Sequence, residues 1–204
     1  MSLELSKKAA AVKPSSTLAI TAKAKELKAQ GKDVVGFGAG EPDFNTPENI
    51  CEAAIKAIKD GFTKYTPASG TNELKAAISK KFKEFNGLDY DTDQIVISNG
   101  GKHSLTNIFT ALINPGDEVI IPAPFWLSYP EIVKLAGGVP VIVTTTKEQN
   151  FKLTAEDLAA AVTDKTKALV LNTPNNPTGM LYTEEELRAI AKVAVEKEDR
   201  KSVV

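Results

Sequence analysis

From about residue 95 to residue 195, the chain alternates between short β-branched runs and longer segments with helical periodicity. Strands are expected at residues 95–97, 119–121, 139–143 and 168–171, with helices at 105–112 and 129–135. Neighbouring parallel strands need a long crossover connection, usually a helix, whereas antiparallel strands can be joined by a short turn. The alternation therefore predicts an α/β fold, a three-layer sandwich in which helices cover both faces of a mainly parallel sheet.

The later helices have clear start signals. Thr154 with Asp157, and Thr183 with Glu186, have the spacing of a capping box, in which two side chains satisfy the free N–H groups of a first helical turn. We therefore expect one helix to begin after Thr154 and another after Thr183.

The first ninety residues predict an arm, three helices and one short strand. The first dozen residues are interpreted as the arm, and the helices are expected to end near the glycines at positions 31, 61 and 87. The second of these helices is expected to be capped by Thr46, with Pro47 at its first position. The strand is expected at residues 34–37.

Composition excludes several classes of partner. The 25 basic and 26 acidic residues are interspersed and give a net charge of -1, which does not suit a polyanion or an anionic membrane. No apolar run approaches the ~20 residues that a membrane-spanning helix needs. The single cysteine, Cys51, excludes an internal disulfide, and the chain does not open with a positively charged stretch followed by an apolar segment. We expect a cytoplasmic protein that binds neither nucleic acid nor membrane, and no metal site is predicted.

The segment Gly100-Gly101-Lys102 follows an expected strand and opens an expected helix. Open α/β sheets bind ligands at this position, where backbone N–H groups and the helix dipole can hold a phosphate. A lysine in the first turn opposes the dipole, so Lys102 is locally unfavourable unless an anion binds beside it. The alternative is a glycine-softened turn with an exposed lysine.

Two further loops follow expected strands. The loop at residues 172–179 holds three asparagines and two prolines, and it either directs amides toward a polar ligand or is a polar turn before a helix. The loop at residues 122–126 ends in Trp126, the only tryptophan of the chain. Its ring is suited to stacking on a flat cofactor, and the alternative is a core anchor.

Five motifs in order and spacing resemble those of the class I aminotransferases, most closely the bacterial aspartate aminotransferase subgroup. The resemblance runs from about Lys13 to about Val195, and its motifs are 38–44 (GAGEPDF), 64–67 (KYTP), 100–102 (GGK), 124–130 (PFWLSYP) and 175–179 (NNPTG). Five ordered motifs are far more specific than any one of them. The resemblance implies a fold type I enzyme that uses pyridoxal 5'-phosphate (PLP), with an amino acid and a 2-oxo acid as substrates.

The resemblance also implies how PLP is held. The backbone of the segment at Gly100, Gly101 and Lys102 is expected to hold the phosphate, and Tyr65 is expected to reach the phosphate bound in a neighbouring subunit. Trp126 is expected to stack on the pyridine ring, and Asn176 to donate a hydrogen bond to the ring's phenolic oxygen.

The substrate is expected to contact some of the same residues. Gly40 is expected to lie against the α-carboxylate of the substrate, beside Trp126 and Asn176. In the acidic-substrate subgroup, the lysine that matches Lys102 is thought to bind the side-chain carboxylate. Pro124 and Pro177 match positions where the family often has cis peptide bonds.

The resemblance implies an incomplete fold. Residues 1–45 would form the arm and the start of the small domain, and residues 46–204 the amino-terminal part of the large PLP-binding domain of a homodimer. The family's Schiff-base lysine lies beyond the matched residues, so no catalytic residue is predicted. A charged stretch from Glu196 to Arg200 stands where the family begins another buried strand, and the expectation is a truncated or frameshifted, inactive form.

Three alternatives to aspartate transamination stay open. The first is prephenate amination, in which Lys13 would help to bind a second carboxylate. The second is a non-catalytic binding or dimerisation fragment, because the lysine is missing. The third, nucleotide or sugar-phosphate binding at Gly100-Gly101, is disfavoured because no acidic residue is placed as a dinucleotide site requires.

Overall fold

The structure is a computed structural model that describes residues 4–38, 40–196 and 202–203 of the 204. The chain divides into two compact units. We call Met1–Pro14 together with Gly100–Val204 the sheet unit, and Ser15–Asn99 the helical unit. Of the charged stretch from Glu196 to Arg200 that was interpreted as a truncation signal, residues 197–200 lie outside the described residues.

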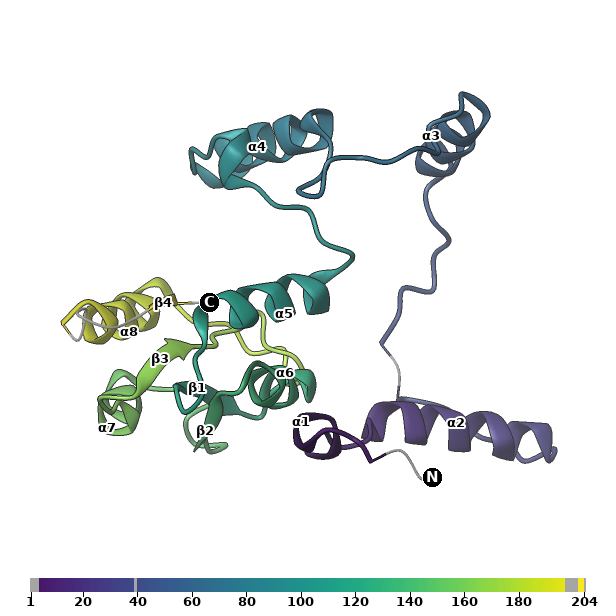
Figure 1. The fold of residues 1–204 in the computed structure, drawn as a ribbon. Coiled ribbons are helices and arrows are strands. Elements are labelled where there is room, and N and C mark those ends of the chain that lie inside the picture. The colour runs from purple at the N-terminus through teal and green to yellow at the C-terminus, as the bar shows by residue number, and fades with distance from the viewer. Residues whose placement is uncertain (1–3, 39, 197–201, 204) are drawn as a thin grey trace. The chain divides into compact units, whose positions relative to one another are not determined.

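The sheet unit contains a parallel sheet in the order β2-β1-β3-β4 (Figure 1). Its strands are β1 (Glu118–Ala123), β2 (Val139–Thr144), β3 (Thr166–Leu169) and β4 (Ser202–Val203). Its helices are α1 (Lys7–Ala10), α5 (Gly101–Leu112), α6 (Ser128–Ala136), α7 (Ala155–Ala161) and α8 (Glu184–Glu196). The strands and crossover helices confirm the predicted α/β fold.

Successive side chains of β1 point to opposite faces of the sheet, and each face is covered by helices, which gives three layers. Val119 and Ile121 belong to one apolar cluster with Phe109 of α5 and Val133 of α6. Ile120 points to the opposite face, where its cluster includes Leu158 and Ile190 from α7 and α8. Full burial of one such side chain stabilises a fold by about 1.5–3 kcal/mol, so β1 anchors both helical layers.

The helical unit contains α2 (Ser16–Ala29), α3 (Glu48–Lys59), α4 (Asn72–Asn86) and the 3₁₀ turn η1 (Thr92–Gln94). Its buried residues, among those described, are Lys75 and Ile95. A tight local contact lies beside them, since the Ile97 N–H donates to the Ser69 carbonyl at 3.0 Å. Gly70 is required there, because a Cβ at its φ of +99° would lie 2.2 Å from the Ile97 side chain.

Both strands predicted in the helical unit are wrong. Residues 34–37 and 95–97 are extended but have no strand partner among the described residues. A strand is defined by its ladder to a neighbour, and β-branched composition alone does not supply one. The start predicted for the second helix is also off by one residue, because α3 begins at Glu48 with Pro47 at the N-cap position and no side-chain cap.

The other helix signals are confirmed. Both bonds of the Thr154–Asp157 and Thr183–Glu186 capping boxes are present. The helix predicted to end at position 87 is α4, which Gly87 closes in the left-handed conformation.

Candidate cofactor site in the sheet unit

The start of α5 presents open backbone. Gly100 has a φ of +86°, which favours glycine, and a Cβ at Gly100 or Gly101 would meet no atom within 4 Å. The N-cap residue Gly100 makes no side-chain cap bond, and the first turn of this helix holds no acidic residue. The backbone N–H groups of a helix start and the positive end of the helix dipole therefore favour an anion at this position.

Lys102 and Trp126 are neighbours. The Lys102 Nζ lies over the Trp126 ring, 5.0 Å from its centroid, within the range of a cation–π contact. The opening of α5 and the loop after β1 therefore meet at one place. The cation–π contact also keeps the ammonium group of an exposed lysine close to the opening of α5.

Trp126 packs as a core anchor, one of the two roles considered for it, and its stacking on a cofactor stays a prediction. Its ring packs partly buried against the apolar cluster of α5 and α6. It also makes an edge contact with Tyr129, with 5.5 Å between ring centroids and an angle of 81° between ring planes. Burial raises the pKa of the Tyr129 hydroxyl, so the ring beside Trp126 is a neutral phenol.

The asparagine loop after β3 is held by its own side chains. Asn172 Oδ1 accepts a hydrogen bond from the Asn176 N–H at 2.9 Å. Asn175 Oδ1 accepts from the N–H and the hydroxyl of Thr178, at 3.2 and 3.0 Å. The Asn176 side chain is exposed, so its amide is accessible to a ligand.

One hydrogen bond joins the two loops. Asn175 Nδ2 donates to the Pro124 carbonyl at 3.5 Å. The loops after β1 and β3 and the opening of α5 are thus linked through Asn175 to Pro124 and through Trp126 to Lys102. Both peptide bonds predicted to be cis, before Pro124 and before Pro177, are cis, and so is the bond before Pro174.

Gly40 and Tyr65 belong to the helical unit, and their part in the site stays a prediction. Tyr65 is fully exposed, and a Cβ at Gly40 would meet open space. Both positions are therefore accessible from solvent, as a role in binding would require.

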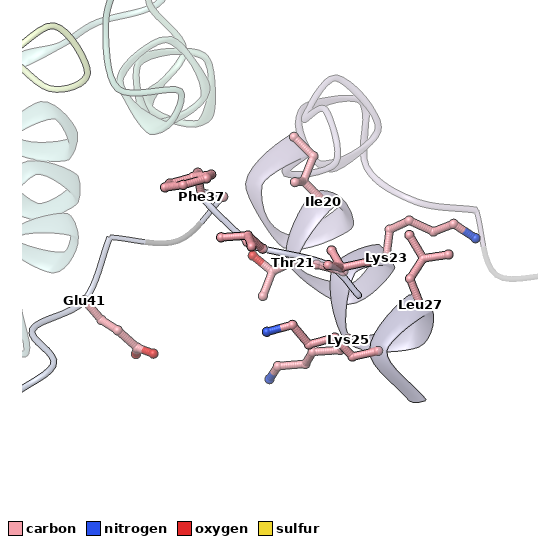
Figure 2. Close-up of a pocket in the computed structure, with 13 residues that line it drawn as sticks. Ile20, Thr21, Lys23, Lys25, Leu27, Phe37 and Glu41 are labelled. Carbon is pink, nitrogen blue, oxygen red and sulfur yellow. The ribbon is translucent and has the colours of Figure 1, made fainter. Parts of the chain in front are cut away.

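The helical unit has an open groove of about 530 Å³ between α2 and residues 34–38. Figure 2 shows Ile20, Thr21 and Leu27 on the side of α2, with Phe37 on the extended segment. Its lining combines apolar residues such as Ile20 and Phe37 with charged residues such as Lys25 and Glu41.

Sequence reasoning missed three residues around the site. Thr145 and Asn175 hydrogen-bond the backbone before Trp126. Glu131 of α6 accepts from the Lys13 N–H at 3.1 Å and from Lys134 Nζ at 2.9 Å. Only the crowding of asparagines near Asn175 gave a signal, because the Thr145–Ala123 and Glu131–Lys13 contacts join residues far apart in the chain.

The described residues contain neither a membrane-spanning helix nor a metal-binding cluster. None of their helices is long and apolar enough to cross a membrane. Among the same residues, no group of three or more histidine, cysteine or acidic side chains is arranged to hold a metal ion.

Comparison with known proteins identifies the class. The family model "Aminotransferase class I and II" matches residues 32–199, and the chain therefore belongs to this family. The chain is 62% identical over 183 residues to the aspartate aminotransferase of Bacillus sp. strain YM-2, covering 90% of this chain and 47% of the relative. It is 58% identical over 182 residues to the probable aspartate/prephenate aminotransferase of Rhizobium leguminosarum bv. phaseoli, covering 89% and 46%.

The solved structures agree. The aspartate aminotransferase of Thermus thermophilus with maleate matches with a TM-score of 0.94 and 48% identity, covering 99% of this chain and 53% of that one. The chain thus spans about half the length of the relatives it matches.

Proposed function

We propose that this chain supplies the amino-terminal half of a PLP-dependent aminotransferase that moves an amino group from aspartate, or another acidic amino acid, to a 2-oxo acid. The observation that carries the proposal is the linked rim of the sheet unit, where Lys102 lies over Trp126 and Asn175 joins the neighbouring loop. Ligands of open α/β sheets bind at this edge.

The residues present fit PLP. The glycine-lined start of α5 suits a phosphate, the partly buried Trp126 suits a flat ring, and the exposed Asn176 suits a polar ring substituent. When bound, PLP supplies an electron sink for negative charge at the substrate's α-carbon. The protein's task at this rim is to orient the ring and to bind its phosphate.

Lys102 supports an acidic substrate. Its ammonium lies beside the Trp126 ring, where it is placed to pair with a carboxylate on a substrate held next to that ring. The T. thermophilus relative was solved with maleate, which is a dicarboxylate. A dicarboxylic substrate would use Lys102 for one of its two charges.

A chimera tests this proposal. Residues 1–195 are joined to the carboxyl-terminal half of the Bacillus subtilis aspartate aminotransferase, which is 54% identical over 194 residues. The chimera should convert aspartate and 2-oxoglutarate to oxaloacetate and glutamate. Lys102→Met should lower kcat/KM for aspartate about 100-fold, because a charged partner is left unpaired.

The matched control is Lys165→Met, which removes an exposed lysine at the other end of the sheet. It should leave kcat/KM unchanged. A chimera that retains PLP but turns over no acidic amino acid would reject the substrate class. Equal losses for acidic and neutral amino acids in Lys102→Met would reject the role of Lys102.

Prephenate amination is the second candidate. Several relatives are named for both aspartate and prephenate, and Glu131 holds the backbone of Lys13, the residue suggested to bind a second carboxylate. Prephenate and oxaloacetate should therefore be assayed side by side with the chimera. Lys13→Met should reduce amination of prephenate selectively, and equal effects on both substrates would remove this candidate.

A homodimer is proposed for the complete enzyme. The apolar side chains Ile50 and Ile58 of α3, with the nearby Phe62 and Tyr65, are exposed in this chain, as a surface for a second subunit would be. The same proposal assigns residues 1–45 to the arm and the start of the small domain, and residues 46–204 to the large domain. It also includes a cytoplasmic location. Sedimentation of the chimera tests the dimer.

The non-catalytic alternative predicts that the 204-residue chain alone binds a partner or PLP without turnover.

A further inference from the structure

We propose that Thr145 and Asn175 are positioning residues that clamp the loop carrying Trp126 from its two sides. The proposal rests on the proposed function only for its consequence, which is tighter binding of a flat ring at Trp126. The clamp itself is a property of the sheet unit, and it can be tested without any ligand.

Thr145 hydrogen-bonds to Ala123, the first of the two residues that the clamp fixes. The Ala123 carbonyl accepts two hydrogen bonds from Thr145, one from its N–H at 3.1 Å and one from its hydroxyl at 2.5 Å. Thr145 is only 6% exposed, although it follows the edge strand β2, in which Val139 and Ile142 are exposed. A buried hydroxyl needs a partner, and here that partner is the backbone at the end of β1.

Asn175 holds the next residue. Its Nδ2 donates to the carbonyl of Pro124, while its Oδ1 is taken up by Thr178. Its own carbonyl accepts from the Gly179 N–H at 2.8 Å, and its N–H donates to the Met180 carbonyl at 3.0 Å. The donor that reaches Pro124 therefore comes from a loop that is itself internally bonded.

Two consecutive carbonyls, Ala123 and Pro124, are thus fixed from opposite neighbours of β1. Strand β2 pairs with β1 on one side and β3 on the other, so Thr145 and Asn175 act from the two flanks. Two residues later, the Trp126 carbonyl accepts from the Tyr129 N–H at 3.1 Å, which ties the loop to α6. A ring held in place before its ligand arrives loses less freedom on binding.

The experiment uses the 204-residue chain, in which Trp126 is the only tryptophan and its fluorescence reports the loop. Thr145→Val removes the hydroxyl and keeps the shape, and Thr145→Ser is the matched control that keeps it. Asn175→Asp keeps the acceptor for Thr178 and removes the donor to Pro124. Steady-state anisotropy and acrylamide quenching of Trp126 are measured, with circular dichroism as the check on folding.

Thr145→Val and Asn175→Asp should each lower the anisotropy and raise the quenching constant about twofold, while Thr145→Ser should match the parent. Pyridoxamine 5'-phosphate is the ligand probe, because it lacks the aldehyde that couples to surface lysines. Its Kd should rise about fivefold in each of the two variants, the effect of losing one ordinary hydrogen bond. A general loss of stability would lower the melting temperature without this selective change at Trp126.

The proposal is overturned if both variants keep the parent's anisotropy and quenching. It is also overturned if Thr145→Ser behaves like Thr145→Val, because the hydroxyl would then be irrelevant. Should Thr145→Val fail to fold, Asn175→Asp decides the question. If the variants loosen Trp126 but the parent does not bind pyridoxamine 5'-phosphate, the clamp stands, its predicted effect on ligand binding fails, and the chimera decides the proposed function.

Discussion

The sheet unit and the helical unit use the same local signals but differ in what they bury. In the sheet unit, residues of α5, α6, α7 and α8 form two apolar clusters on the faces of the sheet. In the helical unit, α3 has an apolar stripe that includes Ile50 and Ile58, and both residues are exposed. Amphipathic pattern alone therefore does not show whether a helix has found its partner.

The largest expected difference between the units concerns core truncation. Phe109 of the sheet unit is 0% exposed, and Phe109→Ala should lower the free energy of unfolding by about 3–5 kcal/mol. Phe62 of the helical unit is 66% exposed, and Phe62→Ala should change it by less than about 0.5 kcal/mol. Urea unfolding followed by Trp126 fluorescence measures both. Equal losses would show that the helical unit has a core of its own.

Helix caps should have smaller and more local effects. Thr154 accepts from the Asp157 N–H in the sheet unit, and Thr71 accepts from the Leu74 N–H in the helical unit. Loss of either cap costs about 1 kcal/mol. Thr154→Ala should shift the unfolding detected at Trp126, whereas Thr71→Ala should only speed hydrogen exchange in α4. The serine variants are the controls, and a Thr71→Ala shift at Trp126 would show that the two units unfold together.

Acid should weaken the sheet unit through Glu131. Desolvation alone would raise the pKa of this carboxyl, but hydrogen bonds from Lys134 and the Lys13 N–H, with the charges of both lysines, hold its pKa below the usual value. The contribution of Glu131 to the free energy of unfolding is therefore complete above a pH of about 4.3, the ordinary pKa of a glutamate carboxyl. It is lost as pH falls through the lowered pKa.

Glu131→Gln should reduce stability at pH 7 by about 1 kcal/mol and flatten its dependence on pH below 5. Unfolding midpoints of the parent and the variant across this range provide the measurement. Glu156→Gln, at an exposed position of α7, is the control. Parallel pH profiles for parent and Glu131→Gln would contradict the contribution of the Glu131 carboxylate to acid sensitivity.

The smallest effects are expected for exposed ion pairs, which should not distinguish the two units. Arg188 pairs with Glu184 on α8, and Lys56 pairs with Asp60 at the end of α3. Arg188→Ala and Lys56→Ala should each change stability by less than about 0.5 kcal/mol. Calorimetry at low and high salt measures both, and a loss above 1 kcal/mol at either position would show an unrecognised partner.

The sequence predicted the sheet unit better than the helical unit, and burial explains why. Residues 119–121 and 139–143 form strands as expected because each has a neighbour in the sheet. Residues 95–97 have similar β-branched composition, yet Val96 is exposed and no described strand lies beside them. Whether such a run becomes a strand depends on a partner elsewhere in the chain, which composition does not reveal.

The candidate site shows the same limit. Residue type and motif were enough to predict Lys102, Trp126 and Asn176, because their side chains carry the chemistry. The same holds for Gly100 and Gly101, where the lack of a side chain leaves the backbone open. Thr145 and Asn175 were not assigned roles, because their contacts reach 22 and 51 residues along the chain. Positioning residues of this kind are defined by tertiary contacts and leave little trace in a single sequence.

The most direct test of whether one rim of the sheet unit holds a flat, phosphorylated ring is a titration of the chain's Trp126 fluorescence. Pyridoxamine 5'-phosphate and its phosphate-free form, pyridoxamine, are compared, with inorganic phosphate as competitor. We expect saturable quenching by the phosphorylated ligand, at least about tenfold weaker binding of pyridoxamine, and relief by phosphate. Quenching that does not saturate, or that is equal for the two ligands, would contradict a phosphate-dependent site beside Trp126.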